Sequence, residues 1–206
     1  MKLHFTFNLP DLSKALTIAQ QTAEYADVLG IGSLLLFKEG INAIQAFRAT
    51  FPNKEIFAEA RLCEKAEDSV NMMATAGANY ISVLAIAPGS TIKKAVEKAK
   101  DFDVKIALDL LGAPTLGQIA LDAKTLGINL LIFHRPLSKP GDLAELDAEW
   151  HNVKENTKLP LFITGKIDET TIQHILSLKP HGIMIGAAIT KANNPAKAAH
   201  FFKSLI

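Results

Sequence analysis

The sequence predicts an α/β protein, a single (β/α)8 TIM barrel that spans residues 1–206 as one domain. Short apolar runs alternate with longer amphipathic segments along the chain, in eight pairs. Most of these runs are apolar throughout rather than alternating, which is typical of parallel strands covered by helices. An open doubly wound sheet is the competing layout, but no Gly-x-Gly-x-x-Gly turn follows the first strand.

Eight short apolar runs are the predicted strands. In chain order they are Leu3–Phe7, Val28–Ile31, Glu55–Ala60, Tyr80–Leu84, Lys105–Leu110, Leu130–His134, Leu161–Thr164 and Ile183–Ile185. A parallel βα repeat of this number closes most naturally into a barrel, with short loops at this chain length.

The segments between the strands have the apolar spacing of helices. The predicted helices are Leu16–Ala19, Ile41–Phe47, Ala66–Ala76, Thr91–Ala99, Thr115–Leu126, Leu143–Val153, Ile172–Leu178 and Pro195–Leu205. Asp11 and Ser13 offer caps for the first helix, and Gly77 and Gly127 follow the ends of the third and fifth. Start and stop signals therefore recur where the barrel needs them.

The composition limits the class of partner. Apolar residues make up 49% of the chain and charged residues 21%, which is ample for a packed core. The formal net charge of +1 argues against binding along a nucleic acid backbone. No run reaches the roughly 18 apolar residues of a membrane span, and no signal peptide is evident. We therefore expect a cytoplasmic protein with neither a nucleic acid nor a membrane as partner.

The chain has a single cysteine, Cys63. One cysteine excludes an intrachain disulfide and a metal site built from several cysteines, and it fits a reducing compartment. We expect Cys63 to be a buried residue on an apolar turn rather than a nucleophile.

Charged residues gather where the third predicted strand ends, and in a barrel all strand carboxyl ends open into one mouth. Glu59 and Arg61 lie two positions apart, so their side chains face the same way, and Glu64 follows on the turn. Charges this close to an apolar run are costly unless they pair or take part in chemistry. The alternative is a surface salt bridge at a strand end.

Other strand ends add polar candidates. Asn8 follows the first strand, Asp109 lies near the end of the fifth, and His134 and Arg135 end the sixth. A histidine can act as a general acid or base near neutral pH, although a lone histidine is more often structural. No role is predicted for the remaining histidines, His4, His151, His174, His181 and His200.

The seventh and eighth strands end in glycine turns, at the usual phosphate corner of a barrel. These turns are Thr164-Gly165-Lys166 and Gly186-Ala187. Glycines let backbone N–H groups approach an anion, helix N-termini favour negative charge, and Lys166 adds a cation. The alternative is that Gly165 and Gly186 are ordinary turn glycines.

Segments along nearly the whole chain resemble the orotidine 5′-phosphate decarboxylase superfamily. They are Lys38–Ile44, Ala76–Asn79, Thr91–Ala95, His134-Arg135, Ile185–Thr190 and Asn194–Ala199. The branch they are most similar to is that of 3-hexulose-6-phosphate synthase and 3-keto-L-gulonate-6-phosphate decarboxylase. The superfamily's Asp-x-Lys-x-x-Asp motif at the third strand reads Glu59-Ala60-Arg61-Leu62-Cys63-Glu64 here, with every charge sign kept and every charged residue changed.

The chain also departs from the pattern that this resemblance implies. Asn8 stands in place of an aspartate on the first strand, Gly30 in place of a metal-binding glutamate on the second, and Lys166 in place of a glycine. The resemblance implies a Mg²⁺ ion that binds an enediolate intermediate. Glu59 and Asp109 would hold that ion here, through oxygen ligands and water.

The resemblance further implies a homodimer in which Glu64 reaches into the partner's pocket. The apolar run Leu34–Phe37 after the second strand is compatible with an interface, and burial within the same chain is the alternative. Arg61 stays protonated at any ordinary pH, so it can stabilise an anion but is a poor proton donor.

We therefore expect a carbon–carbon lyase that acts on a phosphorylated ketose, by aldol cleavage or decarboxylation, through a metal-stabilised enediolate. The catalytic candidates are Glu59, Arg61, Glu64 and His134. The candidates for binding the sugar phosphate are Asn8, Asp109, Arg135, Thr164, Gly165, Lys166, Gly186 and Ala187. Two alternatives stay open, namely a sugar-phosphate-binding barrel without activity, and a sugar-phosphate epimerase or isomerase with Glu59 and Glu64 as acid and base.

Overall fold

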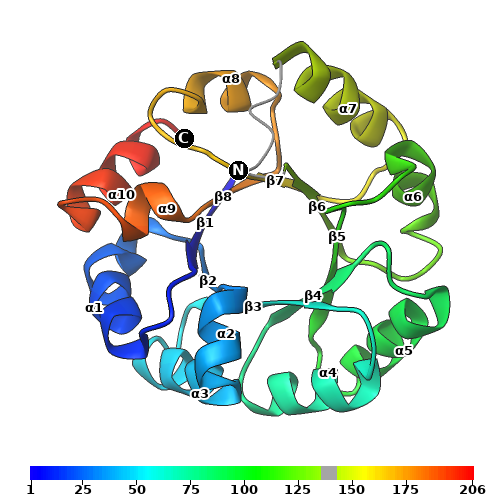
Figure 1. The fold of residues 1–206 in the computed structure, drawn as a ribbon, viewed down its shortest axis with the longest axis horizontal. Helices are drawn as coiled ribbons and strands as arrows, with labels where there is room; N and C mark the ends of the chain where they lie inside the picture. Colours follow the sequence, from blue (N-terminus) through cyan, green and yellow to red (C-terminus); the bar gives the residue numbers. More distant parts are fainter. Residues whose placement is uncertain (136–142) are drawn as a thin grey trace.

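The computed structural model describes residues 1–135 and 143–206, which form a closed barrel of eight parallel strands with helices outside it (Figure 1). Strands that follow one another in the chain are neighbours in the sheet, and β1 also pairs with β8, which closes the ring. The strands are β1 (Lys2–Phe7), β2 (Val28–Ile31), β3 (Glu55–Leu62), β4 (Tyr80–Leu84), β5 (Lys105–Asp109), β6 (Leu130–His134), β7 (Leu161–Thr164) and β8 (Gly182–Ile185). The predicted fold class is confirmed.

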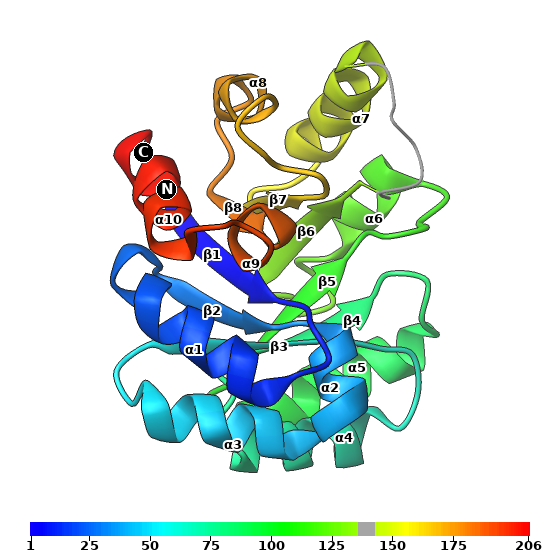
Figure 2. The ribbon, with the colours of Figure 1, turned by 60° about the vertical axis from the view of Figure 1, so that its left-hand side comes forward.

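Helices surround the sheet on its outer side (Figure 2). They are α1 (Leu12–Thr22), η1 (Ala23–Tyr25), α2 (Ser33–Glu39), α3 (Ile41–Thr50), α4 (Ala66–Thr75), α5 (Gly89–Lys100), α6 (Leu116–Asp122), α7 (Leu143–Glu155), α8 (Ile172–Ser177), α9 (Ala187–Thr190) and α10 (Pro195–Ser204). Within the two described stretches, no helix is long and apolar enough to cross a membrane.

Local signals in the sequence account for several helix starts. The Asp11 side chain accepts a hydrogen bond from the Lys14 N–H at 2.9 Å and caps α1. Asn194 does the same for the Lys197 N–H at 2.9 Å, and Pro195 occupies the first turn of α10. Such caps satisfy N–H groups that a helix leaves unpaired at its start.

Several boundaries differ from the prediction. β3 runs to Leu62, with a register shift against β4 between Ala58 and Leu62, and β5 stops at Asp109. Two helices, rather than one, follow β2, because Gly40 adopts a positive φ of 61° that ends α2 before α3 begins. The four-residue α9 likewise precedes α10 after β8.

The core has two parts, one on each side of the sheet. A small cluster comes from strand residues alone, at alternate positions that face the barrel interior. Its members are Val28, Phe57, Tyr80, Ala107, Leu130, Ile132, Phe162 and Met184. The larger cluster fills the space between the strands and the helices, and includes Phe7, Phe47 and Trp150. Because side chains fill its interior, the barrel is a packed scaffold that holds the residues at the carboxyl ends of its strands.

Candidate functional site

A polar layer covers the apolar interior at the carboxyl ends of the strands. Since inward-facing side chains recur every second residue, positions two beyond the interior cluster also face inward. The residues at these positions are Gly30, Glu59, Ser82, Asp109, His134, Thr164 and Gly186, and Thr6 of β1 joins them because it lies in register with Gly30. The barrel thus gathers residues from all eight strands into one layer, and five of them were predicted site residues.

Glu59 lies at the centre of one hydrogen-bond group. It is 5% exposed, and its Oε1 atom accepts a hydrogen bond from Thr6 Oγ1 at 2.6 Å and contacts His4 Nε2 at 3.1 Å. Burial alone would raise the pKa of the Glu59 carboxyl, but His4, Thr6 and the nearby Arg61 charge outweigh it and lower that pKa. Glu59 is therefore a buried, ionised carboxylate and not part of a surface salt bridge.

Asp109 lies at the centre of a second group. It is 2% exposed, and its Oδ2 atom is 3.0 Å from Arg61 Nε and 3.1 Å from His134 Nδ1. The N–H of Leu111 also donates to Asp109 Oδ1, at 3.0 Å. Burial alone would raise the pKa of the Asp109 carboxyl, but His134 and Arg61 outweigh it and lower that pKa. This carboxylate fixes the position of both its cationic neighbour and the imidazole.

Arg61 joins the two groups. Its Nη2 atom lies 3.9 Å from Glu59 Oε2, while its Nη1 atom donates to Ser33 Oγ at 3.1 Å. The residue has a φ of 48°, in the left-handed region, and its backbone N–H donates to Ser82 Oγ at 2.9 Å. A non-glycine residue in this region costs about 1–3 kcal/mol. At this residue the surrounding contacts, with Asp109, Ser33 and Ser82, hold the side chain between two buried carboxylates.

His4 is a site residue that sequence reasoning missed. It is fully buried on β1, its ring centroid is 5.1 Å from that of Phe57, and its Nε2 atom contacts Glu59. The signal was the strand period, because Thr6 and His4 share the inward face. Only the closed barrel, however, shows that Glu59 from β3 reaches this side chain across β2.

Asn8 and Glu64 lie outside the buried network. The Asn8 side chain accepts a hydrogen bond from the Leu34 N–H at 2.9 Å, and so holds the start of α2. Glu64 is exposed on the turn after β3, and no contact joins it to the network in the described part of the chain. Cys63 beside it is exposed as well, so the expectation of a buried cysteine is wrong.

The ends of β6, β7 and β8 form the predicted phosphate corner. Thr164 Oγ1 donates to the Met184 carbonyl oxygen at 3.2 Å, and the Arg135 N–H donates to the Thr164 carbonyl oxygen at 3.1 Å. Gly165 has a φ of 111°, and a Cβ there would lie 2.2 Å from the Arg135 carbonyl oxygen, so glycine is required. Lys166 has a φ of 44° and is exposed.

Gly186 precedes α9, and Ala187 is its exposed first residue. The two predicted turns thus lie side by side on neighbouring strands, β7 and β8. A bound phosphate at this corner stays a prediction.

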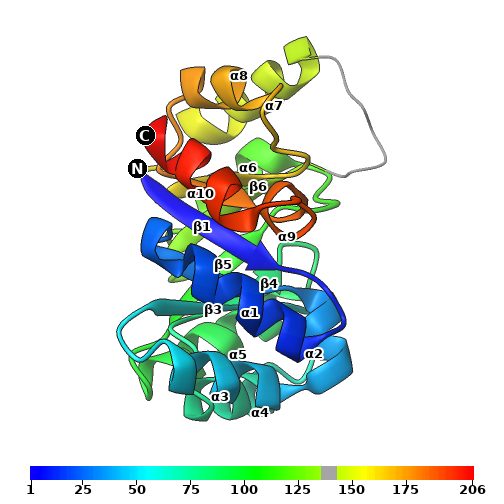
Figure 3. The same ribbon diagram turned by 90° about the vertical axis from the view of Figure 1, so that its left-hand side faces the viewer.

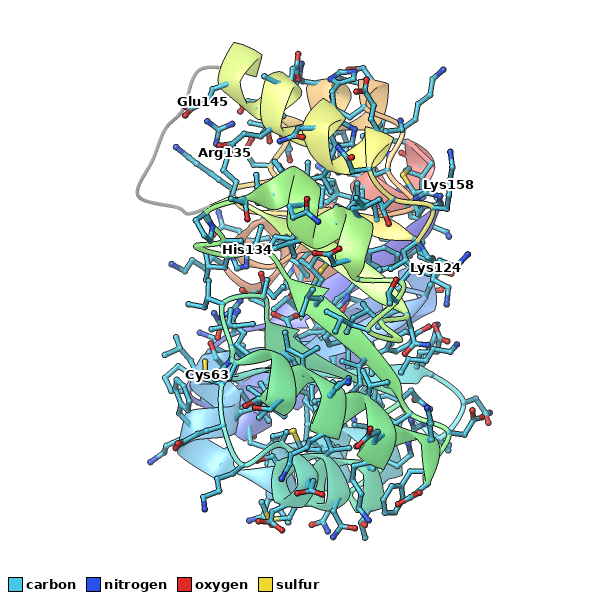
Figure 4. The ribbon with its side chains drawn as sticks, turned by 90° about the vertical axis from the view of Figure 1, so that its right-hand side faces the viewer. Cys63, Lys124, His134, Arg135, Glu145 and Lys158 are labelled. Atoms are coloured by element: carbon cyan, nitrogen blue, oxygen red, sulfur yellow. The ribbon has the colours of Figure 1, made fainter. Side chains whose placement is uncertain are left out.

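His134 also faces a cavity next to the network. This cavity has a volume of about 160 Å³ and is lined by Arg135, Leu116, Glu145 and Glu149 among others. Figure 4 shows His134, Arg135, Glu145 and Cys63 toward one side of the molecule. Lys124 and Lys158, which precede β6 and β7, lie toward the opposite side (Figure 4).

The residues present do not fit the magnesium site that the resemblance implies. Mg²⁺ prefers about six oxygen ligands in octahedral geometry. Gly30 offers no side chain, and nitrogen donors already contact Glu59 and Asp109. Among the described residues there is no group of three or more His, Cys, Asp or Glu side chains arranged to hold a metal ion. Magnesium binding stays a prediction that no observation tests, and the donor set argues against it.

Comparisons with known proteins extend over the whole chain. The orotidine 5′-phosphate decarboxylase / HUMPS family matches residues 1–202. A Mycobacterium gastri protein named 3-hexulose-6-phosphate synthase is 30% identical over 210 residues, with 100% of both chains covered. A Bacillus subtilis protein of the same name is 26% identical over 207 residues, covering 100% of this chain and 99% of that protein.

Solved structures agree with these sequence matches. A crystal structure of a 3-hexulose-6-phosphate synthase has a TM-score of 0.92 and 30% identity, with 100% of both chains covered. A ligand-bound crystal structure of KGPDC from Streptococcus mutans also has a TM-score of 0.92, at 23% identity, covering 98% of this chain and 95% of that one. At that identity the likeness shows the fold alone. The chain therefore belongs to the orotidine 5′-phosphate decarboxylase / HUMPS family, on the branch that its sequence resembles.

Proposed function

We propose that this protein is a carbon–carbon lyase that acts on a phosphorylated ketose, in the manner of 3-hexulose-6-phosphate synthase. The observation that carries the proposal is the end-to-end likeness to proteins of that name, together with the buried acid–cation network at the barrel mouth. Aldol cleavage is proposed ahead of decarboxylation because the relatives at 26–30% identity are all named as synthases. Proteins named as decarboxylases support only the fold.

The chemistry needs an acceptor for one proton and a cation near a developing negative charge. In aldol cleavage the bond between the carbon next to the carbonyl and the carbinol carbon breaks, and the electron pair stays on the former as an enediolate. The carbinol hydroxyl loses its proton and becomes the carbonyl of the released aldehyde, and the enediolate then takes up one proton at carbon to give the shorter ketose phosphate. Arg61, which is permanently charged, stabilises the enediolate oxygen.

His134 moves the proton in this scheme. Asp109 contacts its Nδ1 atom, which leaves Nε2 as the nitrogen that exchanges a proton with the substrate. The phosphate lies at the corner formed by Thr164, Gly165 and Lys166 of β7 and by Gly186 and Ala187 beyond β8, with Arg135 beside it. Gly165 and Gly186 are partly exposed and Lys166 is exposed, so an anion can approach this corner, which supports the assignment.

We also propose a homodimer as the working form. The side chains of Leu34 and Phe37 on α2 are 48% and 81% exposed, and Met72 on α4 is 48% exposed. Exposed apolar side chains of this size on neighbouring helices suit a protein interface. In this proposal Glu64, which is exposed between β3 and α4, reaches into the partner's site rather than its own network. The cytoplasmic location stays a prediction.

The proposed reaction is tested by incubating the purified protein with 3-hexulose 6-phosphate and measuring formaldehyde release, with and without added Mg²⁺. We expect turnover by the wild-type protein. His134→Asn should lower kcat by roughly 10²–10⁴-fold, since it removes the proton-transfer group. Lys158→Ala, on the opposite side of the molecule, is the matched control and should leave kcat unchanged (Figure 4).

Three outcomes contradict this assignment. Carbon dioxide release from 3-keto-L-gulonate 6-phosphate without formaldehyde release from the hexulose would make the protein a decarboxylase. Exchange of a proton with solvent deuterium next to the carbonyl, without bond cleavage, would make it an epimerase or isomerase. Binding of a sugar phosphate with no turnover in any assay would make it a binding protein.

A further inference from the structure

His4 and the empty side-chain position of Gly30 share one space in the polar layer. A Cβ atom on Gly30 would lie 2.0 Å from His4 Nε2 and 2.5 Å from Glu59 Oε1. Non-bonded atoms do not approach this closely, so His4 as placed and a larger residue at position 30 exclude each other. The imidazole thus occupies the volume into which a side chain from β2 would project.

Nitrogen donors of the chain surround both carboxylates of the network. His4 Nε2 lies 3.1 Å from Glu59 Oε1, and Arg61 Nη2 lies 3.9 Å from Glu59 Oε2. Arg61 Nε lies 3.0 Å and His134 Nδ1 lies 3.1 Å from Asp109 Oδ2. An N–H group directed at a carboxylate oxygen competes with a cation for the same lone pair, and the guanidinium charge repels one.

Packing alone does not explain a histidine at position 4. The side chain is fully buried beside Phe57, and its Nδ1 atom has no hydrogen-bond partner in the described residues. An unpartnered polar atom costs free energy that an apolar side chain of the same size would avoid. What histidine adds, and an apolar side chain lacks, is the nitrogen that contacts Glu59.

We infer that His4 and Arg61 together take the place of a divalent cation, so that this site works without a bound metal ion. His4 fills the position of a missing ligand on β2 and holds Glu59, while Arg61 supplies the permanent charge between the two carboxylates. The catalytic part of this inference rests on the proposed function. The metal-binding part does not rest on the proposed function, because it concerns only which nitrogen and oxygen atoms surround Glu59 and Asp109.

Titration of the full chain with Mn²⁺, followed by electron paramagnetic resonance, tests the metal-binding part. Manganese(II) accepts the oxygen ligands that suit Mg²⁺ and its free form gives a direct signal. We expect the wild-type protein to leave the free Mn²⁺ signal unchanged. The double variant His4→Ala, Gly30→Glu removes the nitrogen donor and adds a third carboxylate, and should bind one Mn²⁺ per chain.

Saturable binding of one Mn²⁺ by the wild-type chain, lost in Glu59→Gln and kept in the surface control Glu97→Gln, would overturn the inference. The wild-type titration decides the question even where the double variant does not fold.

A double-mutant cycle tests separately whether His4 and a side chain at position 30 compete for the same space. Gly30→Ala should lower the thermal midpoint more in the wild-type background than in His4→Ala, where only the close approach to Glu59 Oε1 remains, whereas equal losses in both would contradict the shared space.

The formaldehyde assay keeps the two proposals apart. Where the protein turns over the hexulose, EDTA should leave the rate unchanged. A rate that EDTA abolishes and Mg²⁺ restores would overturn the metal-free site and leave the proposed function standing. An absence of turnover under every condition would contradict only the proposed lyase function. The Mn²⁺ titration would still decide whether the site binds a metal ion.

Discussion

Arg61 shows at the scale of one residue how the site combines strain with charge. Its planar guanidinium reaches Asp109, Ser33 and the neighbourhood of Glu59 at once. A lysine offers a point charge and three donors from one atom, so it cannot span the same partners. The left-handed backbone at this position directs the side chain between the two carboxylates.

We predict that Arg61→Lys lowers kcat for aldol cleavage by roughly 10²-fold, within the range for removing one oxyanion donor. The KM should change less, because the phosphate corner lies on β7 and β8. Steady-state kinetics of the variant and of Lys65→Arg, an exposed control with the same left-handed backbone, give the comparison. If the Arg61→Lys protein had the wild-type kcat, the proposed mechanism would not need an arginine at this position.

The sequence could predict that two side chains meet where both lie on one strand, because side chains two positions apart on a strand face the same way. Glu59 and Arg61 lie two apart on one strand, and the structure brings them together as expected. His4 could not be found in this way, because its partner Glu59 lies 55 residues away and meets it only across the closed barrel. Gly30 was recognised as a missing ligand, but its effect on the space around it needs coordinates.

Helix α2 carries two exposed large apolar side chains, Leu34 and Phe37, that bear on assembly. Phe37 is 81% exposed on its outer side. Helix α3 begins directly after Gly40, so the two helices are neighbours in the chain. The prediction that Leu34–Phe37 forms an interface is compatible with these exposures, although Leu35 and Leu36 are buried within the chain.

We predict that the wild-type protein is a dimer and that Phe37→Asp is a monomer, because an interface core that receives an unpaired charge is destabilised. Size-exclusion chromatography with light scattering measures the mass of each. Leu121→Asp, on α6 and 56% exposed, is the control and should stay dimeric. A wild-type monomer over the whole accessible concentration range would contradict the dimer.

Elements were predictable because strands and helices carry different apolar periods. All eight strands lie where the sequence places them, within two residues at their ends. Helix α2 was not predicted, because its apolar run Leu34–Phe37 was interpreted only as a possible interface and the predicted helix began after Gly40, at Ile41. The short α9 has too few residues to show a period.

At the scale of the molecule, stability should depend on pH, because the described residues include two buried carboxylates, Glu59 and Asp109. Glu59 and Asp109 have lowered pKa values in the folded chain. The unfolded chain therefore binds protons at these carboxyls more readily than the folded chain does. The stabilisation that the two ionised carboxylates give to the folded chain is fully present above the ordinary carboxyl pKa of about 4. This stabilisation is lost as the pH falls from about 4 through the lowered pKa values that Glu59 and Asp109 have in the folded chain.

We predict that the free energy of unfolding falls steeply below about pH 4 in the wild-type protein. Glu59→Gln should have a shallower dependence and a lower value at neutral pH, by about 1–3 kcal/mol for the lost buried pairing. Urea unfolding across a pH series measures both. The exposed control Glu97→Gln should follow the wild-type curve, and identical curves for Glu59→Gln and wild type would refute this account.

The barrel's closing seam has a consequence for the order of assembly. The Lys2 N–H donates to the His181 carbonyl oxygen at 2.8 Å, and the two chain ends lie near each other (Figures 2 and 3). During translation β1, β2 and β3 emerge well before β7 and β8. A nascent chain can therefore form the part of the mouth that carries Glu59 before it has made the β7 and β8 turns, where we propose that the phosphate binds. Until the last strand arrives, the outer edge of β1 is an unpaired template that a chaperone or a neighbouring chain can occupy.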